Sequence, residues 1–73
     1  MGKLRVLSGR DVCGILEQQG FQMVRQRGSH MVMQRLTEIG TVTVPVPDHA
    51  EIRIGTLQSI IRQSGIARTA FET

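Results

Sequence analysis

The chain has 73 residues, of which 40% are hydrophobic and two are aromatic, and its formal net charge is +3 at pH 7. We expect one small domain, residues 1–73, because a chain of this length buries only about 60% of its unfolded surface when it folds. Its apolar runs are shorter than the roughly 20 residues of a membrane span, and the single cysteine, Cys13, excludes an internal disulfide and a cysteine-rich zinc site. We therefore expect a cytoplasmic protein without a metal or other cofactor, which gains stability from a partner.

Positive charge is concentrated in the first half of the chain. Residues 1–35 contain six Lys and Arg against two acidic residues, whereas residues 36–73 contain three against four. Eight of the nine basic residues are arginine, whose planar guanidinium suits bidentate contacts with phosphate. The distribution indicates a phosphate-rich partner such as a nucleic acid, and a merely solvated basic surface is the alternative.

The first predicted element is a helix that begins after Ser8. Ser8 is a favourable N-cap, and Asp11 three residues later forms a short capping box with it. Gly20 is placed to end the helix, because glycine adopts the left-handed conformation just past a helix without strain. Cys13 lies within this helix and is expected to pack as a small hydrophobic side chain. The apolar stripe of the helix is Val12, Ile15 and Leu16.

Alternating polar and apolar residues predict two strands joined by a tight turn. The first strand covers residues 21–26, the turn lies at Arg27-Gly28, and the second strand covers residues 29–35. In the second strand, Met31 and Met33 share one face and His30 lies on the other. If the methionines face the helices, His30 lies on the open face of the sheet beside the turn. Met23 of the first strand is also expected in the core.

A third strand and a second helix follow. Residues 41–46 form the strand, and Pro45 and Pro47 place it at an edge of the sheet, where a missing backbone donor is tolerated. A loop over residues 48–54 leads to a helix over residues 55–65, and residues 68–73 are expected to be loosely held. The predicted core residues of these two elements are Val42, Val44, Val46, Leu57, Ile60 and Ile61.

The order of elements is therefore α-β-β-β-α. It predicts an α+β fold in which two helices cover one face of a three-stranded antiparallel sheet and leave the other face open. This layout is that of a small domain of the double-stranded-RNA-binding type, although topology alone does not decide function.

Three segments of the chain resemble the HicA family of bacterial toxins, also called the YcfA-like family. They are the turn Gly28-Ser29-His30, residues 43–49 (TVPVPDH) and residues 55–65 (GTLQSIIRQSG). The resemblance implies a double-stranded-RNA-binding-like fold used as an endoribonuclease that cleaves mRNA, an mRNA interferase. It also implies a HicB-type antitoxin that binds and masks the toxin, so we expect a monomer when free and a hetero-oligomer with the antitoxin.

RNA carries its own nucleophile, the 2′-hydroxyl, so its cleavage needs a base, an acid and cations but no metal. His30 is the candidate catalytic residue, because a histidine with a pKa of about 6.5 exchanges protons near neutral pH, and the resemblance assigns the same role to the histidine of this turn. The basic residues would hold the phosphate, Gly28 would permit close approach, and Ser29 would orient the ring. The expected RNA-binding residues are Lys3, Arg25, Arg27, Gly28, Ser29 and Arg35.

Other interpretations stay open at this stage. A single strand histidine is often structural or simply exposed, and His49 is either a solvated loop residue or the second half of an acid and base pair if its loop folds back. The chain could also be an RNA-binding module that does not cleave, indifferent to His30→Ala, or an interaction domain that uses the edge of the third strand. Without Tyr or Trp there is no aromatic platform for bases, so strong base specificity is not expected.

Overall fold

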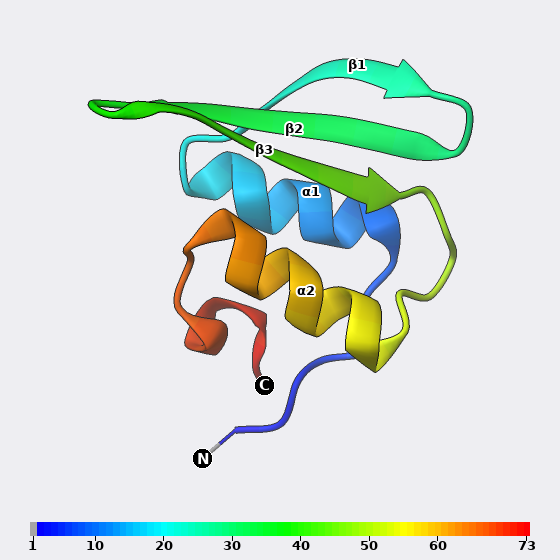
Figure 1. Ribbon diagram of the computed structural model, residues 1–73. Helices are drawn as coiled ribbons and strands as arrows, with labels where there is room; N and C mark the ends of the chain where they lie inside the picture. The colour runs from blue at the N-terminus through cyan, green and yellow to red at the C-terminus, as the bar shows by residue number, and fades with distance from the viewer. Residues whose placement is uncertain (1) are drawn as a thin grey trace.

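Two helices cover one face of a three-stranded sheet in the computed structural model, which describes residues 2–73 (Figure 1). The elements are α1 (Gly9–Gln18), β1 (Gln22–Arg27), β2 (His30–Thr37), β3 (Gly40–Pro47), α2 (Ile54–Ser64) and the short 3-10 helix η1 (Arg68–Phe71). The strands are ordered β1-β2-β3, and both neighbouring pairs are antiparallel. The predicted α+β fold and the order α-β-β-β-α are confirmed, and β3 is an edge strand as expected.

The start of α1 is stabilised by the predicted capping box. The backbone N–H of Asp11 donates to the Ser8 hydroxyl, and the backbone N–H of Ser8 donates to the Asp11 carboxylate, each over 3.0 Å. These hydrogen bonds with Ser8 lower the pKa of Asp11. Gly20 follows the helix with a positive φ of 93°, as expected for the residue that ends it.

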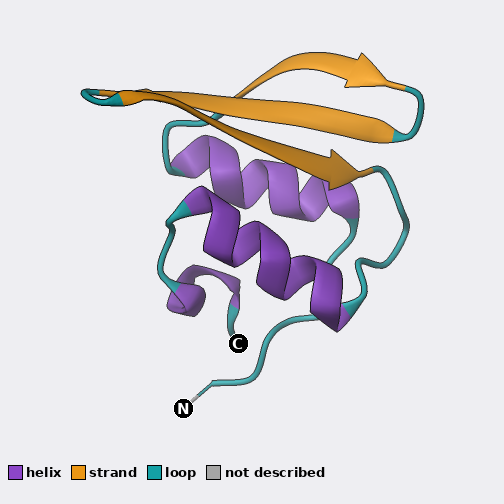
Figure 2. Ribbon diagram, viewed as in Figure 1, coloured by secondary structure: helices purple, strands orange, loops and turns teal. Residues whose placement is uncertain are grey.

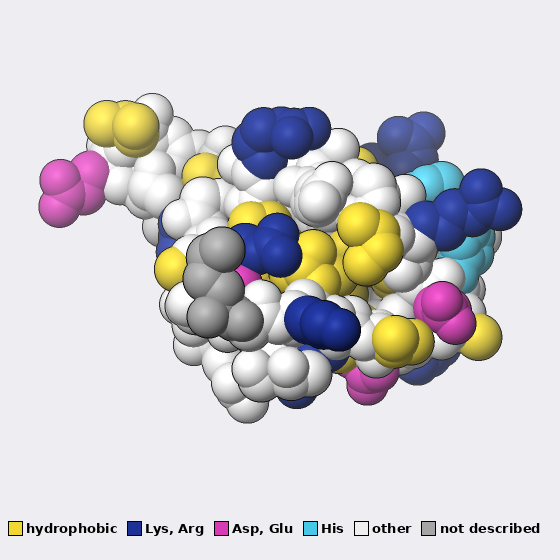
Figure 3. Space-filling model, turned by 90° about the horizontal axis from the view of Figure 1, so that it is seen from below, with side chains coloured by type: hydrophobic (Ala, Val, Ile, Leu, Met, Phe, Trp, Pro, Cys, Tyr) yellow, Lys and Arg dark blue, Asp and Glu magenta, His cyan; other side chains and the backbone are white. Residues whose placement is uncertain are grey.

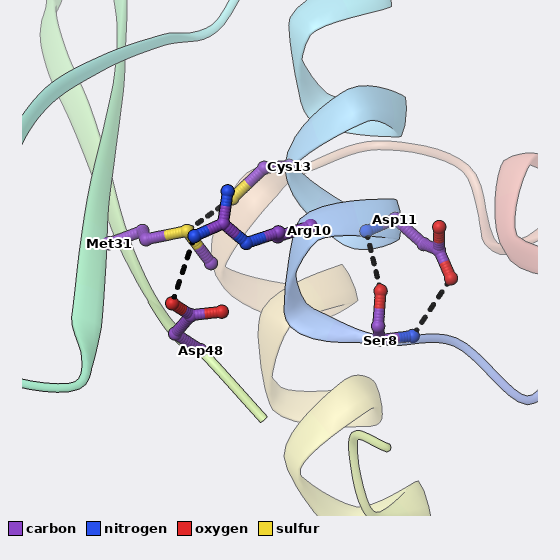
Figure 4. A network of polar contacts seen from close by, with 6 residues as sticks. All are labelled: Ser8, Arg10, Asp11, Cys13, Met31 and Asp48. Carbon is purple, nitrogen blue, oxygen red and sulfur yellow. Dashed lines mark hydrogen bonds and ion pairs between the residues drawn. The ribbon is translucent and has the colours of Figure 1, made fainter. Parts of the chain in front are cut away.

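Cys13 is a packing residue. Its Sγ lies 3.9 Å from Sδ of Met31, in the contact between α1 and β2 (Figure 4). Burial raises the pKa of the thiol to about 11, so almost no reactive thiolate is present near neutral pH.

The core lies between the sheet and the helices. Met31 of β2 is opposite Val46 of β3, and Met33 is opposite Val44, and all four side chains are buried. Met23 does not join them, because its side chain is 52% exposed. It pairs with Met33 on the helix-facing side, but β1 is an edge strand and all of its residues are exposed. The prediction that Met23 is a core residue is therefore wrong.

The β2–β3 hairpin is longer than predicted. Pairing continues through Leu36↔Thr41 and Thr37↔Gly40, so the loop expected over residues 36–40 shrinks to the two residues between Thr37 and Gly40. The polar residues near the hairpin tip indicated a loop. Their backbones nevertheless stay paired, because this part of the hairpin does not need apolar side chains to cover a core. The hairpin consequently extends beyond the helices (Figure 1).

The second helix has the predicted buried stripe and ending. Leu57 and Ile60 are buried, and Ile61 packs against the core from its edge. Gly65 ends α2 with a φ of 72°, and its N–H donates to the carbonyl oxygen of Ile61. No helix within residues 2–73 is long and apolar enough to cross a membrane.

The C-terminal segment is held more firmly than predicted. The side chain of Phe71 is completely buried, and the backbone N–H of Arg5 donates to its carbonyl oxygen over 2.9 Å. The N–H of Thr73 donates to the carbonyl oxygen of Lys3, also over 2.9 Å, so the two terminal segments lie side by side (Figure 2). The expectation of a loose end is wrong because a single aromatic side chain anchors a segment too short to show periodicity.

Candidate functional site

A two-residue turn at one end of the sheet positions His30. Arg27 and His30 are directly paired across β1 and β2, so the turn is Gly28-Ser29, one residue later than the predicted Arg27-Gly28. Gly28 has a φ of 56°, the positive value that type II′ turns require at the first of their two central residues and that glycine adopts without strain. The side chains of a directly opposed pair lie on the same face of a sheet, so Arg27 and His30 are neighbours.

The face that carries His30 is the open one, as predicted. Its neighbour Met31 points into the core, and successive residues of a strand alternate between faces. On its other side His30 is paired with Pro47 of β3. The imidazole is exposed and makes no hydrogen bond with any side chain or backbone group of residues 2–73. It is therefore accessible to a ligand that approaches the open face.

A β-bulge places Arg25 on the same face. Met23 is opposite Met33, but Arg25 is opposite Val32, so β1 contains one extra residue between these pairs. Strict alternation along the strand would place Arg25 on the same face as Met23, and the extra residue changes this. The bulge turns Arg25 and Arg27 to the face of His30, as bulges beside functional sites often re-aim side chains.

The loop after β3 starts beside the turn and then runs from the end of the sheet to the helices (Figure 1). The N–H of Asp48 donates to the carbonyl oxygen of Ser29 over 2.6 Å, and the N–H of Gly9 donates to the carbonyl oxygen of His49 over 2.8 Å. A side chain at Gly9 would overlap the carbonyl oxygen of Pro47, so the close approach of α1 to β3 depends on glycine at this position. The loop is thus attached both to the turn and to the first turn of α1.

This arrangement brings both histidines of the chain to one end of the molecule. The space-filling view shows the histidine side chains gathered there beside a group of basic side chains (Figure 3). His49 is exposed, and it is its backbone rather than its imidazole that attaches the loop. That His49 completes an acid and base pair with His30 stays a prediction, because these contacts fix only the backbone of the loop.

Arg10 is a neighbour of this end that the sequence analysis did not include. Its guanidinium lies 3.4 Å from the Asp48 carboxylate, and its side chain is 76% exposed (Figure 4). Arg10 also lines a groove along α1 together with Arg5 and Gln18. No local pattern marks Arg10, because its position depends on the packing of α1 against the end of β3.

Two of the predicted RNA-binding residues lie elsewhere. Arg35 is on the helix-facing side of β2, with its Cζ 5.1 Å from the centre of the Phe21 ring and its Nη1 3.3 Å from the carbonyl oxygen of Gln19. At about 3.4 Å per strand residue it is about 17 Å along β2 from His30. Lys3 accepts a hydrogen bond from Thr73 through its carbonyl oxygen, and the N-terminal segment to which it belongs runs on the side of the helices away from the sheet (Figure 1). The structure therefore brings together Arg25, Arg27, Gly28, Ser29 and His30, but not Lys3 or Arg35.

The described part of the chain offers no cluster for a metal ion, since no group of three or more His, Cys, Asp or Glu side chains comes together in residues 2–73. The chemistry available at this end is that of exposed imidazoles and guanidinium groups. Such groups transfer protons and bind phosphate oxygens near neutral pH.

The chain is thus a small α+β domain with an exposed histidine, His30, and two exposed arginines, Arg25 and Arg27, on the open face of its sheet. Comparison with protein families matches residues 9–66 to the family described as HicA toxin of bacterial toxin-antitoxin. The match covers most of the chain, so the protein belongs to the HicA toxin family, as the sequence resemblance indicated. It is therefore a toxin of the toxin-antitoxin type, and its family implies an antitoxin partner. A search of curated proteins finds no match to the chain.

Proposed function

We propose that this toxin is a metal-independent endoribonuclease that cleaves mRNA in the cytoplasm, with His30 as general acid or base. The observation that carries the proposal is the exposed, unbonded imidazole of His30 directly opposite Arg27 on the open sheet face. An imidazole in contact with a phosphodiester can take the proton of the 2′-hydroxyl or give one to the leaving 5′-oxygen. Such proton transfer contributes about 10²- to 10⁴-fold to rate.

The arginines support the same reaction. Attack of the 2′-oxygen on phosphorus builds negative charge on the phosphate oxygens, which guanidinium groups close to His30 would stabilise. Arg27 is directly opposite His30, and Arg25 lies on the same face, opposite Val32. Gly28 leaves the turn without a side chain, and a Cβ there would meet no other atom within 4 Å, so a phosphate can approach the backbone closely.

A HicB-type antitoxin would neutralise the enzyme by covering this end. The turn residues, Arg25, Arg27 and His30 are all exposed in the free chain, so a masking partner has direct access to them. A partner with acidic groups would complement the arginines, and rim charges of this kind mainly accelerate association and make it sensitive to salt.

The test is cleavage of unstructured RNA in excess EDTA by the purified protein, by His30→Ala and by Thr41→Ala. Thr41 is an exposed residue of β3 near the opposite end of the sheet and serves as the matched control. We expect cleavage by the wild type and by Thr41→Ala, and a loss of about 10²-fold or more for His30→Ala. Equal cleavage by all three proteins, or cleavage that requires a divalent metal, would contradict the proposal.

The same experiment addresses the second candidate function, an RNA-binding module that does not cleave. The exposed arginines on the open face favour RNA binding whether or not chemistry follows. RNA binding by the wild type without cleavage ends would support this candidate in place of the nuclease.

A further inference from the structure

We infer that His49 is the second proton-transfer group of the same reaction and acts with His30 on opposite sides of one phosphodiester. This inference rests on the proposed ribonuclease function and names the residue that completes it. Cleavage needs both a base for the 2′-hydroxyl and an acid for the leaving oxygen, and a single imidazole can hold only one of these protonation states at a time.

The first support is the position of His49. Pro47, the last residue of β3, is paired with His30. His49 follows Pro47 by two residues along the chain, so it is close to a direct neighbour of His30. An antiparallel pair separates two Cα atoms by about 5.5 Å, and each chain step adds at most about 3.8 Å, so the two histidine Cα atoms are within about 13 Å. Two imidazoles with a phosphate group between them can fill such a gap.

The second support is the way in which the loop is held. Backbone hydrogen bonds secure it on both sides of the His49 Cα, from Asp48 N–H to the Ser29 carbonyl oxygen and from Gly9 N–H to the His49 carbonyl oxygen. Because the backbone provides these contacts, the imidazole of His49 is free of structural hydrogen bonds within residues 2–73 and is exposed. A positioned backbone with a free side chain is the arrangement that a reacting group needs.

The third support is the charge around the pair. The charged groups around the two histidines are Arg25 and Arg27 on β1, Arg10 on α1, and Asp48 and Glu51 in the loop. Asp48 is already paired with Arg10 over 3.4 Å. The guanidinium groups favour phosphate at this end, so a substrate phosphate can sit between the histidines without competition from a free carboxylate at Asp48.

The proposed step is balanced without any further reactant. One neutral imidazole accepts the proton of the 2′-hydroxyl while the 2′-oxygen forms a bond to phosphorus. The bond from phosphorus to the 5′-oxygen breaks, and the other imidazolium donates its proton to that oxygen. The products are a 2′,3′-cyclic phosphate and a 5′-hydroxyl, and the two histidines end with their protonation states exchanged.

The experiment measures kcat and KM against pH, in EDTA, for the wild type, His30→Ala, His49→Ala and His49→Asn. Thr41→Ala is the control, because it changes an exposed residue near the opposite end of the sheet. We expect a bell-shaped pH profile for the wild type and for Thr41→Ala. In each alanine variant, kcat should fall at least 10²-fold and one limb of the pH profile should disappear. His49→Asn should have the same kcat and profile as His49→Ala, because an amide cannot transfer the proton.

A second substrate assigns the roles. In an RNA whose scissile 5′-oxygen is replaced by sulfur, the leaving thiolate needs no proton from an acid. The alanine variant that lacks the acid should therefore recover toward the wild-type rate on this substrate, whereas the variant that lacks the base should stay slow. Circular dichroism of each variant confirms that it is folded before its rate is interpreted.

The outcomes separate the two proposals. Absence of cleavage by the wild type overturns the ribonuclease function and this inference with it. Cleavage with an unchanged rate in His49→Ala overturns the inference alone. A third outcome also overturns the inference. If His49→Ala is slower mainly through a raised KM, keeps both limbs of the pH profile, and no variant recovers on the sulfur substrate, then His49 only binds RNA.

Discussion

The two ends of the sheet differ in how neighbouring segments are attached to them. At the histidine end, backbone groups join the β1–β2 turn, the β3–α2 loop and the start of α1, through Asp48 N–H to Ser29 and Gly9 N–H to His49, and the ion pair of Arg10 with Asp48 adds to them. At the hairpin end, the strands pair as far as Thr37 and Gly40, and side chains make the further contacts, with the Thr37 hydroxyl donating to the Gly40 carbonyl oxygen and Arg35 to that of Gln19. The hairpin tip itself extends beyond the helices (Figure 1).

This difference indicates which end is suited to chemistry. Backbone contacts position a segment without occupying its side chains, so His30, His49 and Arg27 are held in place and remain available to a ligand. At the hairpin end, the cationic Arg35 is occupied by Phe21 and by a backbone oxygen, and the exposed residues include the apolar Leu36 and Ile39.

The largest effect is expected from Gly9→Ala, which disturbs the histidine end from a distance. The added methyl group would overlap the Pro47 carbonyl oxygen, so α1 and the loop must move apart. Overpacking of this kind costs about 1–3 kcal/mol of unfolding free energy, and we expect cleavage to fall by about 10- to 100-fold as the histidines lose their geometry. Urea denaturation and the cleavage assay measure the two quantities.

Gly14→Ala is the matched control for this change. Gly14 lies inside the same helix, and a Cβ there would meet no atom within 4 Å. Alanine in place of a helix-interior glycine should raise stability by about 0.5–1 kcal/mol and leave cleavage unchanged. If the two variants behave alike, the packing of α1 against β3 does not position the site.

The features that the sequence predicts well are those that neighbouring residues determine. The Ser8 and Asp11 capping box, Gly20 and Gly65 at the helix ends, and the glycine turn before His30 all depend on a few adjacent residues. The alternation of Met31 and Met33 with His30 likewise follows from the period of a strand. The prediction that His30 lies on the open face depended only on such local rules, and it is confirmed.

The features that the sequence did not predict arise from contacts between distant segments. The bulge before Arg25 is visible only as a shift in pairing with β2, and Met23 is exposed on an edge strand although it faces the helices. Phe71 joins the core by packing a segment of the C-terminus that shows no periodicity. The contact of Arg10 with Asp48 joins residues 38 positions apart, which no local pattern reports.

A smaller effect, on RNA affinity, is expected to separate Arg27 from Arg35. Each contact with a phosphate of single-stranded RNA contributes about −0.7 to the slope of log affinity against log salt concentration. Arg27→Ala should therefore weaken binding and make the slope less negative by about 0.7. Arg35→Ala should leave the slope unchanged, because its guanidinium is engaged with Phe21 and Gln19 on the helix-facing side. Each arginine change is combined with His30→Ala to prevent cleavage. Filter binding of unstructured RNA at several salt concentrations then measures the affinity and the slope of each double variant. Equal slopes for the two arginine variants would remove Arg27 from the site.

The smallest effect is expected at the hairpin tip. The side chains of Leu36 and Ile39 are 83% and 99% exposed, so serine at either position removes no buried contact in the free chain. Stability should change by no more than about 0.5 kcal/mol, as for most surface substitutions. Cleavage in EDTA should equal that of the wild type, because the tip is at the opposite end of the sheet from His30. A loss of cleavage in a variant that stays folded would mean that RNA extends along the whole open face, and the contrast between the two ends would then apply to chemistry but not to binding.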